Sequence, residues 1–151
     1  MDVTTLFEHM PFTNLLGIDI TTAEDGYAEG HVEMREDLSS VPGGGVAHGG
    51  VTYSLADTVG GAAVISLSED VSPTIDMRMD YLTPATADLY AEAEVLRMGG
   101  SVAVASIEVW DEADHHVASA RGVYKTGGDT QGTPWRDRGG DARNGDGERG
   151  E

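Results

Sequence analysis

The sequence of 151 residues contains no cysteine and only one lysine, Lys125. The absence of cysteine excludes disulfide frameworks, thiolate nucleophiles, cysteine-ligated zinc and iron–sulfur clusters. Cations are scarce as well, because nine lysine and arginine residues stand against 27 aspartates and glutamates, a formal net charge of -18. Binding to nucleic acid or to an anionic membrane needs clustered positive charge, so we expect neither partner.

Long apolar runs are also missing. No run approaches the roughly 20 residues of a membrane-spanning helix, and the first residues, with Asp2 and Glu8, lack the basic cluster of a signal peptide. We therefore expect a cytoplasmic protein, and the length fits one domain.

The excess of acid lies in residues 1–125, which carry 21 acidic and 5 basic residues, whereas residues 126–151 carry 6 and 4. A domain with so much like charge repels itself at low ionic strength and gains from screening by salt. We interpret the chain as halophilic, from a high-salt cytoplasm, with an ordinary acidic protein as the alternative. From Thr126 onward glycine and polar residues dominate, so we predict a domain at 1–125 and a disordered acidic, glycine-rich tail at 126–151.

The domain alternates strand and helix patterns. We predict a short helix at Thr4–Met10 that Pro11 stops, a hairpin that turns at 24–26, one long helix, and then four strands. The expected strands are Leu16–Thr22, Tyr27–Met34, Thr74–Leu82, Leu89–Leu96, Ser101–Trp110 and His116–Tyr124, and the long helix is Gly50–Leu67. This order predicts an α+β fold in which an antiparallel sheet wraps the long helix, with a self-associating partner on the uncovered side.

Two pairs of glycines stand out in and before the long helix. Gly60 and Gly61, inside the helix, each cost about 1 kcal/mol relative to alanine, so we expect them to admit a neighbouring backbone at close range. Gly49 and Gly50 follow His48 at the amino end, where free N–H groups and the helix dipole form a donor site for a developing oxyanion.

Asp57 lies in the same helix among apolar residues, and a lone carboxylate there is costly unless it is paired or used. Eight residues at a rise of about 1.5 Å separate Asp57 from Gly49 by roughly 12 Å, too far for both to touch one carbonyl group. Two antiparallel helices across a two-fold axis bring Gly49 of one subunit to Asp57 of the other. We therefore predict that the active unit is a dimer.

These residues resemble a known family. His48-Gly49-Gly50, Leu55-Ala56-Asp57, Thr74-Ile75-Asp76-Met77 and Tyr81-Leu82-Thr83-Pro84-Ala85 are similar to the phenylacetyl-CoA (PaaI-like) thioesterases of the hotdog-fold superfamily, over roughly Pro11 to Lys125. The resemblance implies a hotdog fold, a homodimer that in relatives often becomes a tetramer, and hydrolysis of acyl-CoA to a free acid and CoA. It implies no metal or other cofactor, since CoA is part of the substrate.

The resemblance also implies roles for individual residues. The Gly49 N–H would polarise the thioester carbonyl, with Gly50 beside it at the substrate. Asp57 would be the nucleophile or the general base that activates water. Thr74 would help orient that water, and His48 would position the loop and help at the thioester end.

The chain departs from the family at two places. Many relatives carry Asn or Gln where this sequence has Pro42, so that role is lost or has moved. Relatives also often place a basic residue in the turn occupied by Gly99 and Gly100, near the CoA phosphates. Here the candidates for binding substrate are Arg97, near that turn, and then Arg78 and Arg121.

Other polar residues have simpler interpretations. Asp76 and Asp80 share the strand parity of Thr74, which predicts the same sheet face, but exposed carboxylates are the default in so acidic a protein. His115 and His116 hint at a metal site, yet no third ligand has convincing spacing, so we expect solvated histidines and no metal. Two other functions stay open, a non-catalytic acyl-CoA-binding module and a hotdog enoyl-CoA hydratase, although the loop motif of the hydratase is missing.

Overall fold

A computed structural model describes residues 2–128 and 133–135 of the chain. It contains three α-helices and six strands, with a short 3-10 helix, η1, at Glu36–Leu38. The helices are α1 (Val3–Glu8), α2 (Pro11–Leu16) and α3 (Gly49–Ser68), and the strands are β1 (Ile18–Glu24), β2 (Tyr27–Val32), β3 (Thr74–Tyr81), β4 (Leu89–Met98), β5 (Val102–Asp111) and β6 (His116–Lys125). Most of the predicted tail, 129–132 and 136–151, lies outside the described residues.

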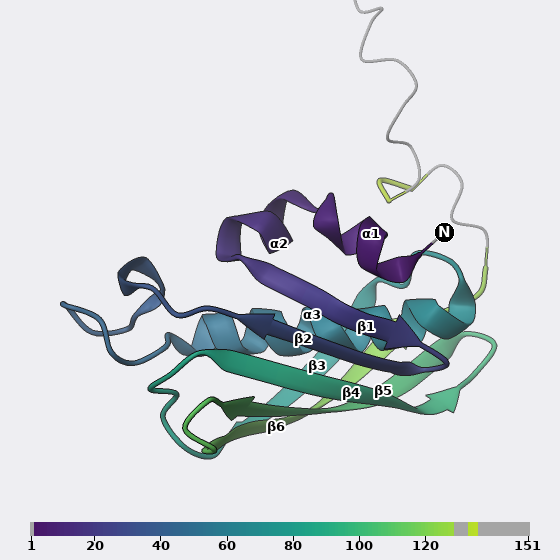
Figure 1. The fold of residues 1–151 in the computed structure, drawn as a ribbon. Coiled ribbons are helices and arrows are strands. Elements are labelled where there is room, and N and C mark those ends of the chain that lie inside the picture. Colours follow the sequence, from purple (N-terminus) through teal and green to yellow (C-terminus); the bar gives the residue numbers. More distant parts are fainter. Residues whose placement is uncertain (1, 129–132, 136–151) are drawn as a thin grey trace, which may run out of the picture.

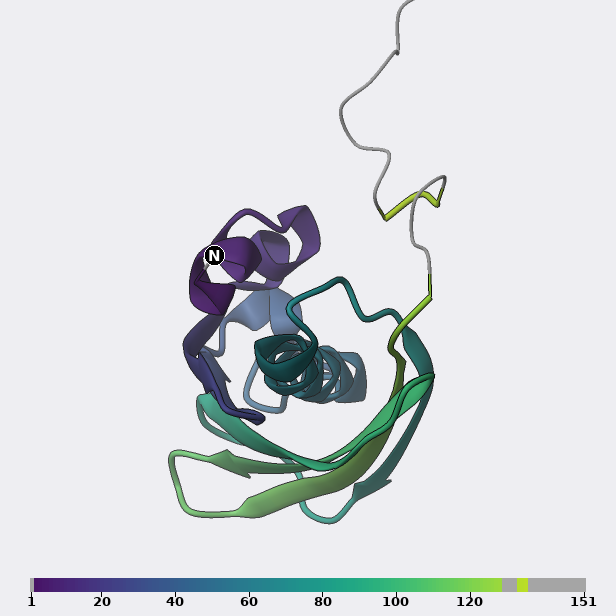
Figure 2. The ribbon, with the colours of Figure 1, turned by 90° about the vertical axis from the view of Figure 1, so that its right-hand side faces the viewer.

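The six strands form one antiparallel sheet in the order β1-β2-β4-β5-β6-β3. Figure 1 shows β4 and β6 below α3 and β1 crossing in front of it, and Figure 2, an end view, shows the sheet curving around that helix. Helix α3 contacts all six strands, while α1 and α2 pack beside β1. The predicted α+β fold, a sheet wrapped around one long helix, is confirmed, and β3 lies at one edge of the sheet.

Small side chains on the inner sheet face explain how closely the helix packs. The buried positions alternate with exposed ones in β4 and with half-buried ones in β5, and they include Ala91, Ala93, Ala103 and Ala105. Alanine leaves room for α3, whose own buried stripe is also rich in small residues, so helix and sheet meet over a continuous core. The helix therefore has a fixed position relative to every strand.

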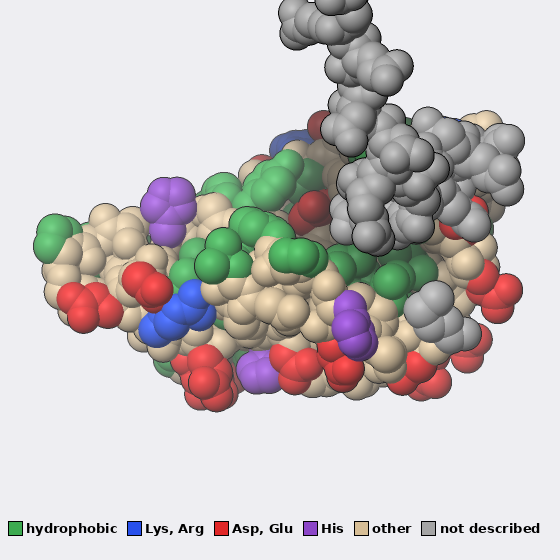
Figure 3. Space-filling view, turned by 90° about the horizontal axis from the view of Figure 1, so that it is seen from above, with side chains coloured by type: hydrophobic (Ala, Val, Ile, Leu, Met, Phe, Trp, Pro, Cys, Tyr) green, Lys and Arg blue, Asp and Glu red, His purple; other side chains and the backbone are tan. Residues whose placement is uncertain are grey.

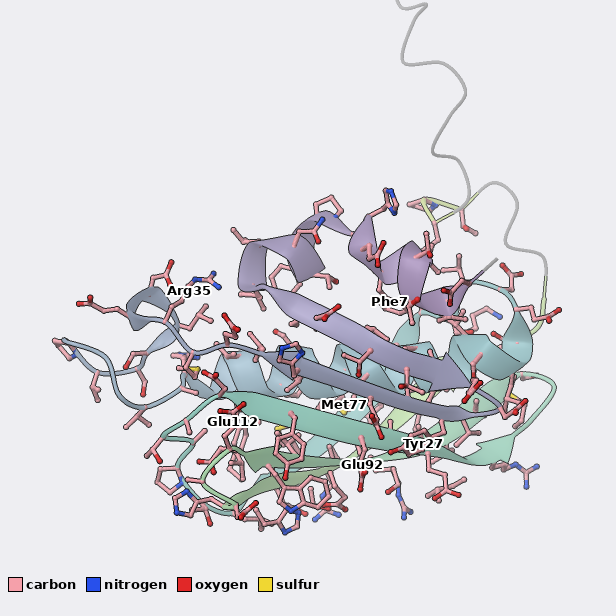
Figure 4. All side chains as sticks on the ribbon, in the orientation of Figure 1. Phe7, Tyr27, Arg35, Met77, Glu92 and Glu112 are labelled. Atoms are coloured by element: carbon pink, nitrogen blue, oxygen red, sulfur yellow. The ribbon has the colours of Figure 1, made fainter. Side chains whose placement is uncertain are left out.

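The outer sheet face is acidic. Tyr27 and Glu92 come from neighbouring strands and lie together on this face (Figure 4), where the Tyr27 hydroxyl donates to Glu92 at 3.1 Å and to Glu29 at 2.6 Å. Carboxylates also dominate the charged side chains on the face that carries α1 and α2 (Figure 3). The negative charge is thus spread over the surface, and water or counterions can screen it.

The amino end contains a helix that was not predicted. Helix α1 ends at Glu8, two residues before the predicted end, and Pro11, predicted only to stop that helix, begins the second helix, α2. A proline fits the first turn of a helix because its missing N–H has no partner to lose there. Gly17, at φ 74°, ends α2, so the first strand starts at Ile18 and not at Leu16.

The remaining element predictions are confirmed to within two residues at each end. Asp25 and Gly26 both have positive φ and make the tight turn between β1 and β2. At the carboxyl end, Thr126 is buried and still belongs to the folded body, since its N–H donates to the Ser101 carbonyl at 2.9 Å. No helix in the described residues has the length and apolar character needed to cross a membrane.

Candidate active site

The amino end of α3 presents one free backbone donor. His48 is the N-cap residue, and its Nδ1 accepts a hydrogen bond from the Gly50 N–H at 2.8 Å. The Val51 N–H donates to the His48 carbonyl at 2.9 Å. Within the described part of the chain, the Gly49 N–H has no hydrogen-bond partner. Of the two glycines predicted to contact substrate, Gly49 therefore has its N–H available, while that of Gly50 is occupied.

The hydrogen bond to Gly50 also assigns the protons of His48. Because Nδ1 accepts, the neutral ring carries its proton on Nε2. The side chain is exposed, and the His48 N–H donates to the Leu38 carbonyl at 2.9 Å, which fixes the loop before the helix. His48 thus offers an N–H donor to a group bound in front of the helix.

Tyr81, at the end of β3, holds the Gly49 peptide. Its hydroxyl donates to the Gly49 carbonyl at 2.8 Å, and its ring lies 3.3 Å from the position that a Gly49 Cβ would occupy. A side chain at position 49 would press against this ring. The glycine therefore lets the tyrosine approach the peptide that carries the free N–H.

Asp57, two turns further along α3, is half-buried and has no cationic partner within ion-pair distance among the described residues. The Thr74 hydroxyl donates to its Oδ1 at 2.7 Å. Burial raises the pKa of the Asp57 carboxyl above its ordinary value, and the hydroxyls of Thr74 and Tyr124 work against that rise. An acid with a raised pKa and a single side-chain donor on its carboxylate is suited to accepting a proton.

An irregularity in β3 turns Thr74 toward Asp57. Thr74 pairs with Tyr124 of β6, but Asp76 pairs with the next residue, Val123, so Ile75 is an extra residue in the ladder. The prediction that Asp76 shares a sheet face with Thr74 was therefore wrong, and so was the same prediction for Asp80. The extra residue reverses the alternation, which places Thr74 on the helix side and the two aspartates on the outer side.

The two halves of the site lie at opposite ends of β3. Gly49 contacts Tyr81 at the carboxyl end of the strand, and Asp57 contacts Thr74 at its amino end. Seven residues of extended strand span roughly 23 Å, and the helical separation is roughly 12 Å. A single chain therefore does not bring the free N–H and the carboxylate to one carbonyl group.

This arrangement has relatives among known proteins. Residues 44–118, which contain α3 and the strands from β3 into β6, match the family model described as the thioesterase superfamily. A Halobacterium salinarum protein whose name assigns it to the esterases is 39% identical over 123 residues, which cover 74% of this chain and 82% of that protein. The chain belongs to the thioesterase superfamily.

Other thioesterases support the fold and the resemblance seen in the sequence. The medium/long-chain acyl-CoA thioesterase YigI of Escherichia coli is 30% identical over 135 residues, covering 79% of this chain and 87% of its own. The solved E. coli PaaI protein of the phenylacetic acid degradation operon superposes with a TM-score of 0.74 at 28% identity, covering 82% of this chain and 89% of PaaI. The predicted hotdog fold and the PaaI-like resemblance are confirmed.

The three arginines expected to bind substrate do not lie on the side of the sheet that faces α3. Arg78 and Arg121 stand directly opposite each other on β3 and β6, and both are exposed. Their neighbours Met77 and Met79 pack against the core, so the arginines face away from α3. Arg97 is exposed on β4, which β5 separates from β6. The structure thus brings two of the three cations together.

The loop before α3 carries Pro42 at an exposed position, where the family resemblance led us to expect an amide. The residues after it, Gly43 to Gly45, have φ values of 84°, 89° and 104°, which favour glycine. The Ser40 N–H donates to the Val46 carbonyl at 2.9 Å and closes the loop. Pro42 supplies no side-chain hydrogen bond there, so whether its role is lost or moved stays a prediction.

The histidines between β5 and β6 have structural partners. His115 Nδ1 lies 3.0 Å from the Asp111 carboxylate, and His116 Nε2 lies 2.6 Å from that of Glu108. The His116 ring also stacks on Trp110, with centroids 5.2 Å apart. In the described ranges of the chain, no group of three or more histidines and carboxylates is arranged to hold a metal ion.

Sequence reasoning missed two tyrosines of the site. Tyr81 was part of the family motif but had no role, and Tyr124 was only the end of a predicted strand. Their contacts with Gly49 and Asp57 join residues 32 and 67 positions apart. The one signal for Tyr124 was the pair of glycines at 60 and 61. We expected Gly60 to admit a neighbouring backbone at close range. It faces the side chains of Tyr124 and Ile107 instead, so that prediction was wrong.

Proposed function

We propose that this chain is an acyl-CoA thioesterase whose active unit is a homodimer formed through β3. The observation that carries the proposal is the distance between the two groups that would act on the thioester. The free Gly49 N–H and the half-buried Asp57 carboxylate lie at the two ends of one edge strand. The outer edge of β3 carries backbone groups that no strand of the described chain pairs.

A two-fold axis at this edge completes the site. Antiparallel pairing of β3 with its copy brings the Thr74 end of one strand to the Tyr81 end of the other. Thr74 contacts Asp57 and Tyr81 contacts Gly49, so each Asp57 then faces the Gly49 of the partner subunit. Ile75 and Tyr81, with 58% and 54% of their surfaces exposed, supply apolar area along this edge.

The chemistry follows from these two groups. The Gly49 N–H and the positive end of the α3 dipole stabilise negative charge on the thioester oxygen as the carbonyl carbon is attacked. Asp57 of the partner subunit either attacks that carbon or takes a proton from the attacking water, with Thr74 orienting the carboxylate or that water. The carbon–sulfur bond then breaks, and CoA leaves as the protonated thiol. When water is the attacking group, the acid is released in the same step; when Asp57 attacks, water hydrolyses the Asp57–acyl anhydride and then releases the acid. The His48 Nε2–H is a donor for the departing sulfur.

The substrate class rests on the relatives and on the arginines. YigI is named as a medium/long-chain acyl-CoA thioesterase. Arg78 and Arg121, opposite each other on β3 and β6, and Arg97 near the turn at Gly99 supply the cations for CoA phosphates. Three exposed arginines in a chain of charge -18 predict a modest affinity for CoA. The reaction as proposed uses no metal or redox cofactor.

The test is free-thiol release from phenylacetyl-, hydroxybenzoyl-, acetyl-, hexanoyl- and palmitoyl-CoA, at molar KCl as well as at low salt. We expect Asp57→Asn to lower kcat/KM by ~1,000-fold or more while the dimer persists, because general-base and nucleophilic steps need the carboxylate. Asp76→Asn is the matched control, since it removes an exposed carboxylate from the same edge strand.

The outcomes separate the candidates. Thiol release that needs Asp57 and not Asp76 supports the thioesterase. Saturable binding of acyl-CoA by a folded dimer without thiol release indicates the non-catalytic binding module, which the exposed Pro42 favours. Turnover of Asp57→Asn at the wild-type rate removes Asp57 from the mechanism.

A further inference from the structure

Tyr124 and Thr74 both reach Asp57 from one register pair of the sheet. The two residues stand opposite each other on β6 and β3, and both face α3. The Thr74 hydroxyl donates to the Asp57 carboxylate at 2.7 Å, and the Tyr124 hydroxyl donates to the Asp57 backbone carbonyl at 3.1 Å. The aspartate is thus held at its side chain by one strand and at its backbone by the next.

Tyr124 occupies a slot that two glycines leave open. Its side chain is 1% exposed. A Cβ at Gly60 of α3 would collide with the Tyr124 hydroxyl, and a Cβ at Gly122 of β6 would lie 2.6 Å from its ring and 2.8 Å from its hydroxyl. A glycine weakens a helix or strand interior relative to alanine, so both elements give up local stability where this ring enters.

The hydroxyl is a permanent donor in this slot. Burial raises the pKa of Tyr124 well above its ordinary value, and the neighbouring Asp57 charge adds to the rise. The proton therefore stays on the oxygen throughout the neutral range. A buried hydroxyl with a fixed donor direction sets the position of the carbonyl it binds, and the Cα of the same residue carries the carboxylate.

We infer that Tyr124 is a positioning residue for Asp57, and that Gly60 and Gly122 form the slot that seats it. This inference rests on the proposed function. Tyr124 is sealed from solvent and does not touch the thioester. It acts by fixing the Asp57 backbone of α3 to β6 while Thr74 directs the carboxylate, so that the partner subunit's bound carbonyl meets a fixed group.

The first variant is Tyr124→Phe, which removes one oxygen and keeps the ring. We expect kcat to fall roughly 10- to 100-fold with KM unchanged, because a misplaced catalytic group loses transition-state contact without weakening substrate binding. We also expect the acidic limb of the rate profile to move to higher pH, since the Asp57 carboxyl loses a group that holds down its pKa. Tyr90→Phe, on the outer sheet face, is the matched control.

A second variant guards against a folding defect. Gly60→Ala keeps the hydroxyl but drives it from the slot, so we expect the same direction of shift in the acidic limb. Carbon-13 NMR of the Asp57 carboxyl in folded Tyr124→Phe reports its titration without any assay of turnover. The same upward shift in the spectrum supports the inference.

The outcomes distinguish this inference from the proposed function. Wild-type protein without thiol release, or with release that ignores Asp57→Asn, contradicts the function. Wild-type activity that depends on Asp57, together with a Tyr124→Phe variant whose acidic limb and NMR titration are unmoved, overturns the inference and leaves the function standing. A fall in melting temperature with unchanged pH dependence assigns Tyr124 a structural role only, which also overturns it.

Discussion

Two aspartates that are shielded from solvent, Asp111 and Asp57, differ in the number of hydrogen bonds they accept and in the direction of their pKa shifts. Asp111, at the end of β5, is fully buried, and its carboxylate accepts four hydrogen bonds of 3.0 to 3.1 Å, one from the Thr86 N–H, one from the Ala113 N–H and two from His115. Asp57 is only half-buried, and its carboxylate accepts one short hydrogen bond, from Thr74. The more deeply buried carboxylate is the better satisfied one.

The pKa values of the two carboxyls are shifted in opposite directions. Burial works to raise the pKa of both carboxyls. At Asp111 the hydrogen bonds from His115 and Thr86 outweigh it, and the pKa is lowered. At Asp57 burial prevails over the hydroxyls of Thr74 and Tyr124, and the pKa is raised. Asp111, which closes a turn, and Asp57, the proposed proton acceptor, thus differ in how many hydrogen bonds their carboxylates accept.

The largest effect that tests this comparison comes from replacing each carboxylate with its amide. We expect Asp111→Asn to lower the free energy of unfolding by about 2 to 4 kcal/mol, because the amide NH₂ faces backbone N–H donors that it cannot satisfy. Asp57→Asn should not lower it, since the amide oxygen still accepts from Thr74 and a half-buried charge is removed. Urea unfolding of both variants at pH 7 measures the difference.

The two variants should also separate stability from activity. Below its melting temperature Asp111→Asn is expected to keep thiol release within a few-fold of wild type, whereas Asp57→Asn loses it. Equal losses of stability in the two variants would show that the donor count does not distinguish the sites.

The second effect is a pair of opposite pH dependences. The pKa of Asp111 is lowered on folding, so its contribution to stability is present above the ordinary carboxyl value and is lost as the pH falls through the folded value. The pKa of Asp57 is raised on folding, so stability is lost as the pH rises from the ordinary value through the folded one. Urea midpoints of wild type and the two amide variants between about pH 3 and 7 measure both trends.

The expected signs are specific. The stability gap between wild type and Asp111→Asn should shrink toward acid. The gap between Asp57→Asn and wild type should grow from acid toward neutral pH. Parallel curves for all three proteins would contradict the comparison.

Much of the architecture could be predicted from local patterns. The apolar stretch around Asp57 is too long for a strand, and the following segments alternate with period two, so one helix and a run of strands follow from the sequence. The motif His48-Gly49-Gly50 lies where a helix begins, and the cap geometry confirms that start. These inferences depend on neighbours within a few residues.

The side-chain partners could not be predicted in the same way. The bulge at Ile75 reverses which side chains of β3 face the helix, and no residue type in that strand indicates a bulge. Tyr124 meets Asp57 across 67 positions, and Thr86 reaches Asp111 across 25. Such contacts depend on the register of the sheet and on the crossing of the helix, which a single sequence with period-two patterns leaves open.

The smallest effect comes from removing one side-chain donor at each aspartate. His115→Ala leaves Asp111 three backbone donors, so we expect a loss of only about 1 kcal/mol in unfolding free energy and no change in turnover.

Thr74→Val removes the one donor to the Asp57 carboxylate and keeps the side-chain shape. We expect kcat/KM to fall roughly 10- to 100-fold, the equivalent of one hydrogen bond to a charged group, with the acidic limb of the rate profile moved to higher pH. Urea midpoints and pH–rate profiles of both variants check this. A Thr74→Val variant that loses stability but keeps wild-type turnover would make Asp57 a structural carboxylate like Asp111. The two aspartates differ in function only if the hydrogen bond to Asp57 contributes to the reaction rate and those to Asp111 contribute to stability.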